Sequence, residues 1–375
     1  MINYDITPVI WKMEQVGGQS YFWDMYHNAL FSYDGVHVQN IRLRCTDKRI
    51  IGIENAYFNG VYCKNGKLYF SSQKADFGMV YSLENNCEKY VEYPEEIKKI
   101  INNNAINAAF SKIIFDEQHA YYIGSEMPCV LVFDIRMEAF TKMVFFELED
   151  FSFFKDAVVV GDAIYIAEGE HDRVVILHKD YSYDVKEFGK LRKGFSSICL
   201  YQASLFLVPR YDEPIIIWNT ETDRTEMVFD YPEGFSFAKD GNREIAFSML
   251  IDEKIYLFPA FASDVIFYDL ERKCLCVDEI ISACIKSEKE NDEETTKCIF
   301  LEKYENTLVI QDGYSLCLQY FDYEKKEVKK EKLEFNENEN AIFKISQMKN
   351  RLDDSEIMYE SDEYNLKDYV RVIAM

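Results

Sequence analysis

The sequence predicts an all-β fold built from repeated four-stranded antiparallel sheets, and two features support this. Short apolar runs of about 4 to 6 residues, rich in Ile, Val, Tyr and Phe, recur through most of the chain. The runs also keep a fixed order, which is clearest at 255–278. There an apolar run at Ile255–Phe258 is followed by a loop, a second run at Val265–Tyr268, a charged turn and a third run at Cys274–Val277. This order is typical of a three-stranded meander.

Two markers give the period of the repeat. The second run of each unit closes on a polar residue, and these residues are separated by 52, 44, 41, 50 and 53 positions: Ser82, Asp134, His178, Asn219, Asp269 and Asp322. The dipeptide Phe-Ser recurs at spacings of 41, 44 and 40: Phe110-Ser111, Phe151-Ser152, Phe195-Ser196 and Phe235-Ser236. We expect this Phe to be a wedge between sheets and the Ser to cap a loop. Two independent markers with a similar period indicate an internal repeat.

A fourth strand is expected before each meander. The candidate strands are Ala56–Cys63, Lys112–Phe115, Ala157–Val160, Ser197–Tyr201, Ala246–Ile251 and Cys298–Tyr304. The runs are continuously apolar rather than alternating, so both faces of each sheet should be covered. Four antiparallel strands in roughly 40 to 50 residues match one blade of a β-propeller, in which sheets stack face to face around an axis.

In layout the chain resembles the kelch and WD-type β-propellers. The resemblance covers residues 53–333 and concerns architecture, because no Gly-Gly pair opens each unit and no Trp-Asp dipeptide closes the second run. The chain is also similar to uncharacterised tyrosine-rich propellers of anaerobic bacteria, and this resemblance implies no function.

Six clear units occupy residues 53–333, at about 47 residues each. The segments 1–52 and 334–375 contain further strand-like runs: Tyr21–Tyr26, Ala29–Tyr33, Val36–Leu43, Ala341–Ile345 and Tyr369–Ile373. We expect both segments to form one more blade, so that N- and C-terminal strands close a seven-bladed ring and leave no free sheet edge. The prediction is a single domain over 1–375, with six blades and an appended hairpin as the alternative. A short helix is expected within Glu95–Asn107.

Charge and cysteine content limit the partners. The formal net charge of −24 argues against binding to nucleic acid or to an anionic membrane. The N-terminus has no basic segment followed by a long apolar stretch, so we expect a cytoplasmic protein. The 10 cysteines are then expected to be reduced and buried as small apolar residues. Cys274 and Cys276 should share one strand face, and core packing is favoured over metal binding because nothing completes a zinc set. No metal or cofactor is expected.

Candidate site residues lie in loops that a propeller gathers on one rim, around the mouth of its channel. These loops join the second and third strands of each blade. Their polar residues are the predicted ligand-binding candidates: Ser125, Glu126, Glu168, Glu170, His171, Arg210, Asp212, Asp264 and Asp312. A concave site with a few convergent polar groups is the usual location for a ligand.

Two groups of these residues have more than one interpretation. The cluster at 168–173, EGEHDR, could perform acid and base chemistry or bind a metal through Glu168, His171 and Asp172. A solvated loop with local charge pairs is the favoured alternative. Arg210 could bind a carboxylate or phosphate of a ligand. Pairing of Arg210 with Asp212 or Glu213 is favoured.

Two functional hypotheses remain. The first is a binding or scaffold propeller that holds a peptide, a partner protein or a carbohydrate at the channel rim. The second is a propeller enzyme that acts on a glycan or small molecule through dispersed acidic and histidine residues. The chain lacks a G-x-S-x-G elbow, a P-loop, an H-E-x-x-H helix and a dinucleotide fingerprint. These absences favour the first hypothesis.

Overall fold

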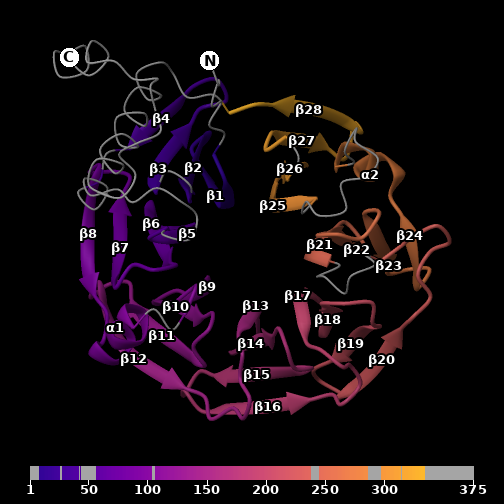
Figure 1. The fold of residues 1–375 in the computed structure, drawn as a ribbon, viewed down its shortest axis with the longest axis horizontal. Helices are drawn as coiled ribbons and strands as arrows, with labels where there is room; N and C mark the ends of the chain where they lie inside the picture. Colours follow the sequence, from indigo (N-terminus) through magenta and orange to yellow (C-terminus); the bar gives the residue numbers. More distant parts are fainter. Residues whose placement is uncertain are drawn as a thin grey trace, which may run out of the picture.

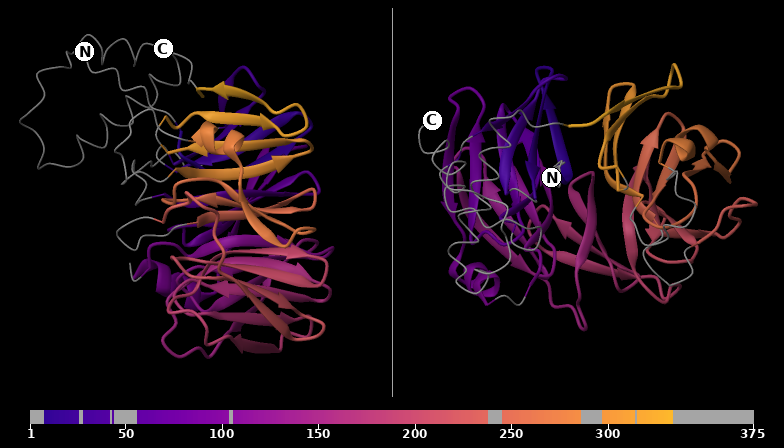
Figure 2. Two further views of the ribbon diagram at one scale, coloured as in Figure 1. Left: turned by 90° about the vertical axis from the view of Figure 1, so that its right-hand side faces the viewer. Right: turned by 45° about the horizontal axis from the view of Figure 1, so that its top comes forward.

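The computed structural model describes residues 8–25, 28–41, 43, 56–103, 106–237, 245–285, 297–313 and 315–333. In them the chain forms seven four-stranded antiparallel sheets, arranged radially around one axis (Figure 1). Figure 2 shows the ring edge-on, as a disc with loops on both faces. The prediction of a seven-bladed propeller is therefore confirmed.

Each blade runs from an inner strand at the axis to an outer strand at the circumference. Blade 1 consists of β1 Ile10–Val16, β2 Gln19–Asp24, β3 Ala29–Tyr33 and β4 Val38–Ile41. Blade 2 consists of β5 Phe58–Lys64, β6 Lys67–Ser72, β7 Phe77–Ser82 and β8 Cys87–Glu92. Blade 3 consists of β9 Phe110–Phe115, β10 His119–Gly124, β11 Cys129–Asp134 and β12 Ala139–Phe145. Blades 4 and 5 are β13 Phe154–Val160, β14 Ala163–Glu168, β15 Arg173–His178, β16 Tyr183–Glu187; and β17 Phe195–Tyr201, β18 Ser204–Pro209, β19 Ile215–Asn219, β20 Arg224–Val228. Blades 6 and 7 are β21 Ile245–Ile251, β22 Lys254–Pro259, β23 Ile266–Asp269, β24 Cys274–Val277; and β25 Cys298–Tyr304, β26 Thr307–Asp312, β27 Leu318–Asp322, β28 Glu327–Glu331.

Two short helices lie in the links between blades, in the part of the chain that the structure describes. Helix α1, Glu95–Asn102, confirms the helix expected after Pro94 and buries Ile97 and Ile101. Helix α2, Glu279–Ile285, was not expected from the sequence. Neither is long and apolar enough to cross a bilayer.

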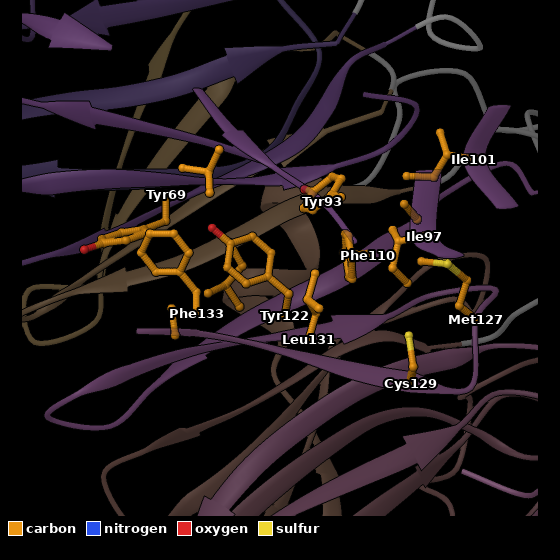
Figure 3. Packing of buried hydrophobic residues seen from close by; sticks show 14 of the residues in the cluster. Tyr69, Tyr93, Ile97, Ile101, Phe110, Tyr122, Met127, Cys129, Leu131 and Phe133 are labelled. Carbon is orange, nitrogen blue, oxygen red and sulfur yellow. The ribbon is translucent and has the colours of Figure 1, made fainter. Parts of the chain in front are cut away.

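The core consists of separate apolar clusters, most of which lie between neighbouring blades. One of them joins blades 2 and 3 through Tyr69, Tyr122 and Phe133, with α1 packed beside it (Figure 3). Phe110 and Phe195 open inner strands and are fully buried, which agrees with the predicted wedge. The other two Phe-Ser markers are displaced, because β13 begins at Phe154 rather than at Phe151 and Phe235 lies in the link before β21.

The ring closes where blade 1 meets blade 7. Blade 1 takes all four strands from Ile10–Ile41, and the sequence had indicated only three runs there. The C-terminal runs expected at 341–345 and 369–373 lie outside the described residues. Blades 1 and 7 share an apolar cluster that contains Ile10, Met13 and Phe300. The described residues therefore supply a complete closing blade from the N-terminal segment.

Burial of the cysteines was only partly anticipated. Nine are described as free thiols, and of these Cys129, Cys199, Cys298 and Cys317 are buried. Cys87 and Cys274 are exposed, which contradicts the expectation that all the thiols are core residues. Both open outer strands, where one face of the chain meets solvent.

Candidate functional site

The loops that carry the candidate residues lie on one face of the ring, as expected. Antiparallel pairing puts the loop between the second and third strands on the same face as the blade-to-blade link; we call this the link face. Backbone hydrogen bonds hold each loop to the link that precedes its blade: Ser125 N donates to Ala109 O at 2.8 Å, Gly169 N to Phe153 O at 3.0 Å and Arg210 N to Gly194 O at 3.1 Å. The candidate side chains therefore project from fixed loops.

Glu168 ends β14 and is fully buried. Its carboxylate accepts hydrogen bonds from Arg173, through Nε and through Nη2 at 3.1 Å, and lies 2.8 Å from Nδ1 of His171. Arg173 also donates to the carbonyl of Glu149 at 2.7 Å. A buried charge is stable when it is paired and hydrogen bonded, and Glu168 meets both conditions. Glu168 therefore fixes the orientation of the His171 ring.

His171 borders an open recess of about 400 Å³ on blade 4. The recess is lined by Glu147, Leu148, Glu149, Asp150, His171, Arg173, Val185 and Glu187. The His171 side chain is 39% exposed, whereas the Arg173 side chain is only 8% exposed and is already paired with Glu168. Carboxylates therefore dominate the accessible surface of the recess.

Glu170 and Arg210 connect the loops of blades 4 and 5. An ion pair joins them, and Glu170 also accepts a hydrogen bond from Lys193 at 2.7 Å. The guanidinium carbon of Arg210 lies 4.9 Å from the ring centroid of Phe153 and 5.6 Å from that of Tyr211, within cation–π range. Hydrogen bonding to Glu170 raises the pKa of Lys193.

The prediction that Arg210 pairs with Asp212 or Glu213 was wrong. Asp212 and Glu213 bind Arg192 instead, at 3.1 and 3.3 Å, and Glu213 also accepts the Arg192 backbone N–H at 2.6 Å. Arg210 instead reaches the neighbouring blade, where it pairs with Glu170 and its guanidinium lies over the ring of Phe153. Asp172 accepts backbone N–H groups of Lys190 and Leu191, so it holds the link to blade 5.

The remaining candidates lie on other blades. Glu126 accepts the backbone N–H of Asn107 at 2.9 Å. The backbone of Ser125 donates to Ala109 O and accepts the N–H of Phe154, which opens β13. Asp264 is partly buried in the loop of blade 6. Asp312 is buried and accepts hydrogen bonds from Ser315 and Gln319. The structure thus gathers Glu168, Glu170, His171, Arg210 and Asp212 at blades 4 and 5, and leaves the other four elsewhere on the link face: Ser125, Glu126, Asp264 and Asp312.

The inner strands carry charged residues that the sequence interpretation missed. Between blades 7 and 1, Lys12 pairs with Glu302 and lies 3.3 Å from Glu14, with the Tyr62 ring centroid 5.5 Å away. Burial acts to lower the pKa of Lys12, but Glu302 and Glu14 outweigh it, and the pKa lies above its usual value. Burial also raises the pKa of the Glu14 carboxyl, against the effect of Lys12.

A second polar network runs across blades 3 to 6. Lys112 pairs with Asp156 at 2.7 Å, Asp156 accepts a hydrogen bond from the Ser197 hydroxyl at 3.0 Å, and Ser197 lies 2.7 Å from the Ser248 hydroxyl. Lys12, Lys112, Asp156 and Ser197 each stand two residues after the residue that opens their inner strand. The recurrence of polar residues at that position of the repeat is the sequence signal that could have identified these four residues.

No group of three or more His, Cys, Asp or Glu side chains in the described part of the chain is placed to hold a metal ion. The set Glu168, His171 and Asp172 does not converge, because Asp172 is turned to the link of blade 5 while Glu168 is turned to Arg173.

The chain is thus a seven-bladed β-propeller whose link face carries the acidic recess of blade 4. The same face carries Arg210, which lies within cation–π range of Phe153 and Tyr211. No protein-family model matches the sequence, and no curated protein is similar to it. Among solved structures the fold is similar to virginiamycin B lyase from Staphylococcus aureus, with a TM-score of 0.61, 8% identity and coverage of 83% of this chain and 93% of that one. It is also similar to the WD40 repeats of RRP9, with a TM-score of 0.53, 10% identity and coverage of 82% and 88%. The computationally designed Ika8 protein is similar as well, with a TM-score of 0.56, 9% identity and coverage of 86% of both chains. Identities this low show the fold alone.

Proposed function

We propose that the protein is a binding propeller that holds a partner protein on its link face, with the recess of blade 4 receiving a lysine or arginine side chain of that partner. The observation that carries this proposal is the recess itself. Its exposed lining carries Glu147, Glu149, Asp150 and Glu187, and its arginine is already committed to Glu168. In the described residues, the side chains of Glu147, Glu149 and Asp150 form no ion pair, so these carboxylates remain available to a cation.

The rest of the link face supports a protein or peptide partner. Tyr231, Phe235 and Phe237 form an aromatic group in the link between blades 5 and 6, with Tyr231 and Phe235 stacked at 5.5 Å. Phe229 beside them is 60% exposed. Aromatic anchors surrounded by polar groups are typical of protein interfaces. A carbohydrate, the other ligand class expected from the sequence, would use the same rings. Binding of glycans but not of peptides would therefore contradict a protein partner.

The test is binding of a fluorescent Lys/Arg-rich peptide, followed by anisotropy at low and moderate salt. The double variant Glu149→Gln/Asp150→Asn should weaken binding about tenfold, since each exposed charge pair contributes up to about 1 kcal/mol. The affinity of the wild-type protein should fall with salt. The matched control is Glu221→Gln/Glu271→Gln, which removes two exposed carboxylates from turns on the opposite face of the ring, between the third and fourth strands of blades 5 and 6. Equal losses in both variants would mean that the net charge of −24 attracts the peptide, and the recess would be dropped.

An enzyme is the second candidate, favoured by the Glu168–His171 pair. A carboxylate 2.8 Å from Nδ1 orients the imidazole, as required of a general base, and places it at the edge of the recess. One protein of similar fold is named as a lyase for virginiamycin B. Incubation of the protein with that compound, followed by mass spectrometry, tests this candidate. Product formed by the wild type but not by His171→Ala would support it, and no product from the wild type would exclude this substrate.

A further inference from the structure

Cys274 and Cys276 form a pair of free thiols on the outer strand of blade 6. They stand two residues apart on β24, so their side chains leave the same face of the strand, and their Sγ atoms lie 3.9 Å apart. Cys274 is exposed and Cys276 is partly exposed. Strand β24 pairs only with β23 in its sheet, which leaves its outer edge open (Figure 1). The two sulfur atoms are therefore close to each other and accessible from solution.

Their separation suits chelation of a single ion. Zinc–thiolate bonds are about 2.3 Å long, and two such bonds spanning 3.9 Å meet at an angle of about 116°. This angle is close to the tetrahedral value of about 109° preferred at zinc sites. The present separation of the two sulfur atoms is therefore compatible with binding both of them to one ion.

A disulfide between the same two residues fits less well. Residues i and i+2 of an extended strand have Cα atoms about 6.6 Å apart, near the upper limit of about 6.8 Å for a disulfide. The Sγ atoms would also have to move from 3.9 Å to bonding distance, which is about 2.05 Å. The two sulfur atoms would have to leave the positions they hold in the structure, whereas they can bind a metal ion at their present separation.

The described surroundings supply no third protein ligand. Asp269 faces Cys274 in the register of β23 and β24, but its carboxylate lies 3.9 Å from Nε of Arg272 and accepts backbone N–H groups of its own turn. No set of three metal-ligating side chains converges in the described residues. Water or a ligand from another molecule would complete the coordination.

We propose that Cys274 and Cys276 form a two-thiolate site for a thiophilic divalent cation such as Zn²⁺ or Cd²⁺. Each thiol gives its proton to the buffer as its sulfur–metal bond forms, so each bound ion releases two protons. The site lies on the circumference of the ring, whereas the proposed partner surface lies on the link face, and its test is independent of that proposal.

The experiment is titration of the reduced full-length protein with Cd²⁺, followed by the ultraviolet charge-transfer absorption of cadmium–thiolate bonds. Cys274→Ser and Cys276→Ser should each weaken binding by at least about tenfold, because loss of an outer-shell partner alone typically costs about 10- to 100-fold in metal affinity. Cys87→Ser is the matched control, because Cys87 is also exposed and also opens an outer strand. It should leave the affinity unchanged.

Two further results would overturn the proposal. One is a band of full intensity in the double variant Cys274→Ser/Cys276→Ser, which would place the ion on other thiols. The other is no saturable band in the wild-type protein. Thermal unfolding of each metal-free variant, compared with that of the wild type, shows whether a lost band reflects the site or a lost fold.

Discussion

Tyr93 and Tyr122 are buried in the same cluster between blades 2 and 3, but their hydroxyl groups differ (Figure 3). The Tyr93 hydroxyl lies 2.6 Å from the Ser72 hydroxyl. The Tyr122 hydroxyl has no hydrogen-bond partner in the described part of the chain. Burial raises the pKa of both phenols, so both remain protonated at neutral pH. The two residues form a natural pair for comparing a satisfied buried hydroxyl with an unsatisfied one.

Replacing each tyrosine with phenylalanine should give opposite results. Tyr93→Phe should lower the free energy of unfolding by about 1 kcal/mol, because the hydrogen bond between Tyr93 and Ser72 is lost. Tyr122→Phe should raise it by about 1 kcal/mol, because an unpaired polar group leaves the core. Urea denaturation gives both values. Equal destabilisation by the two substitutions would show that the Tyr122 hydroxyl is satisfied in solution.

Single-residue contacts were the least predictable part of the site. The sequence placed Glu168 and His171 in one loop, since they are three positions apart, but it could not show that Arg173 encloses Glu168. That burial depends on packing against the link from blade 3. Proximity in sequence also suggested the wrong partner for Arg210, because its actual partner, Glu170, is 40 positions away.

At the scale of elements, local turn chemistry explains why the repeat was visible in the sequence. The Oδ1 atom of Asp134 accepts backbone N–H groups of Arg136 and Met137, at 2.9 and 2.7 Å. Asp269 and Asp322 close their turns in the same way. These Asx turns connect the third and fourth strands, so the polar marker recurs wherever the turn does. Such features depend on neighbours in sequence and could be predicted without coordinates.

Glu138, in the turn between β11 and β12, ties blade 3 to blade 2. Its carboxylate binds Lys67 at 2.5 Å and Lys89 at 2.7 Å. Hydrogen bonds from these two ammonium groups lower the pKa of Glu138 below its ordinary 4.5. A carboxyl whose pKa is depressed by folding adds stability above its unfolded pKa, and that stability is lost as the pH falls through the folded pKa.

The variant Glu138→Gln should therefore lower the free energy of unfolding at pH 7 by up to about 1 kcal/mol, the upper value for an exposed ion pair. The difference from the wild type should shrink as the pH falls below 4.5 and vanish once Glu138 is protonated in both states. Urea denaturation across this pH range measures the effect. Glu84→Gln, an exposed acid in the corresponding turn of blade 2, should show no such trend. A pH-independent difference would contradict the ionic bridge.

At the scale of the whole molecule, the number and length of the repeats predicted seven blades. The sequence analysis nevertheless missed the first strand of the closing blade. Strand β1, Ile10–Val16, places Lys12, Glu14 and Gln15 within a short run, so it lacks the continuous apolar pattern of the other strands. Lys12 and Glu14 are there because β1 borders the axis, where Glu302 pairs with Lys12. This placement depends on ring closure, which the residues of β1 alone do not reveal.

Gln311 holds that closure together. It lies fully buried on β26 of blade 7, and its Oε1 accepts the backbone N–H of Ile10 at 2.9 Å. Its Nε2 donates to the carbonyl of Pro8 at 2.7 Å and to that of Leu316 at 2.9 Å. One amide thus satisfies backbone groups on both sides of the boundary between the first and last blades.

Gln311→Leu keeps the side chain's approximate size and removes these bonds, so it should lower the free energy of unfolding by about 2 to 4 kcal/mol, since each buried group left unpaired costs about 1 to 3 kcal/mol. Hydrogen exchange should accelerate first in β1 and β25, because the ring opens at its weakened boundary. The control is Gln319→Leu, whose amide binds Asp312 within blade 7 and does not cross the boundary. If both variants accelerate exchange in the same strands, closure depends on the apolar packing of Ile10 and Phe300 rather than on Gln311.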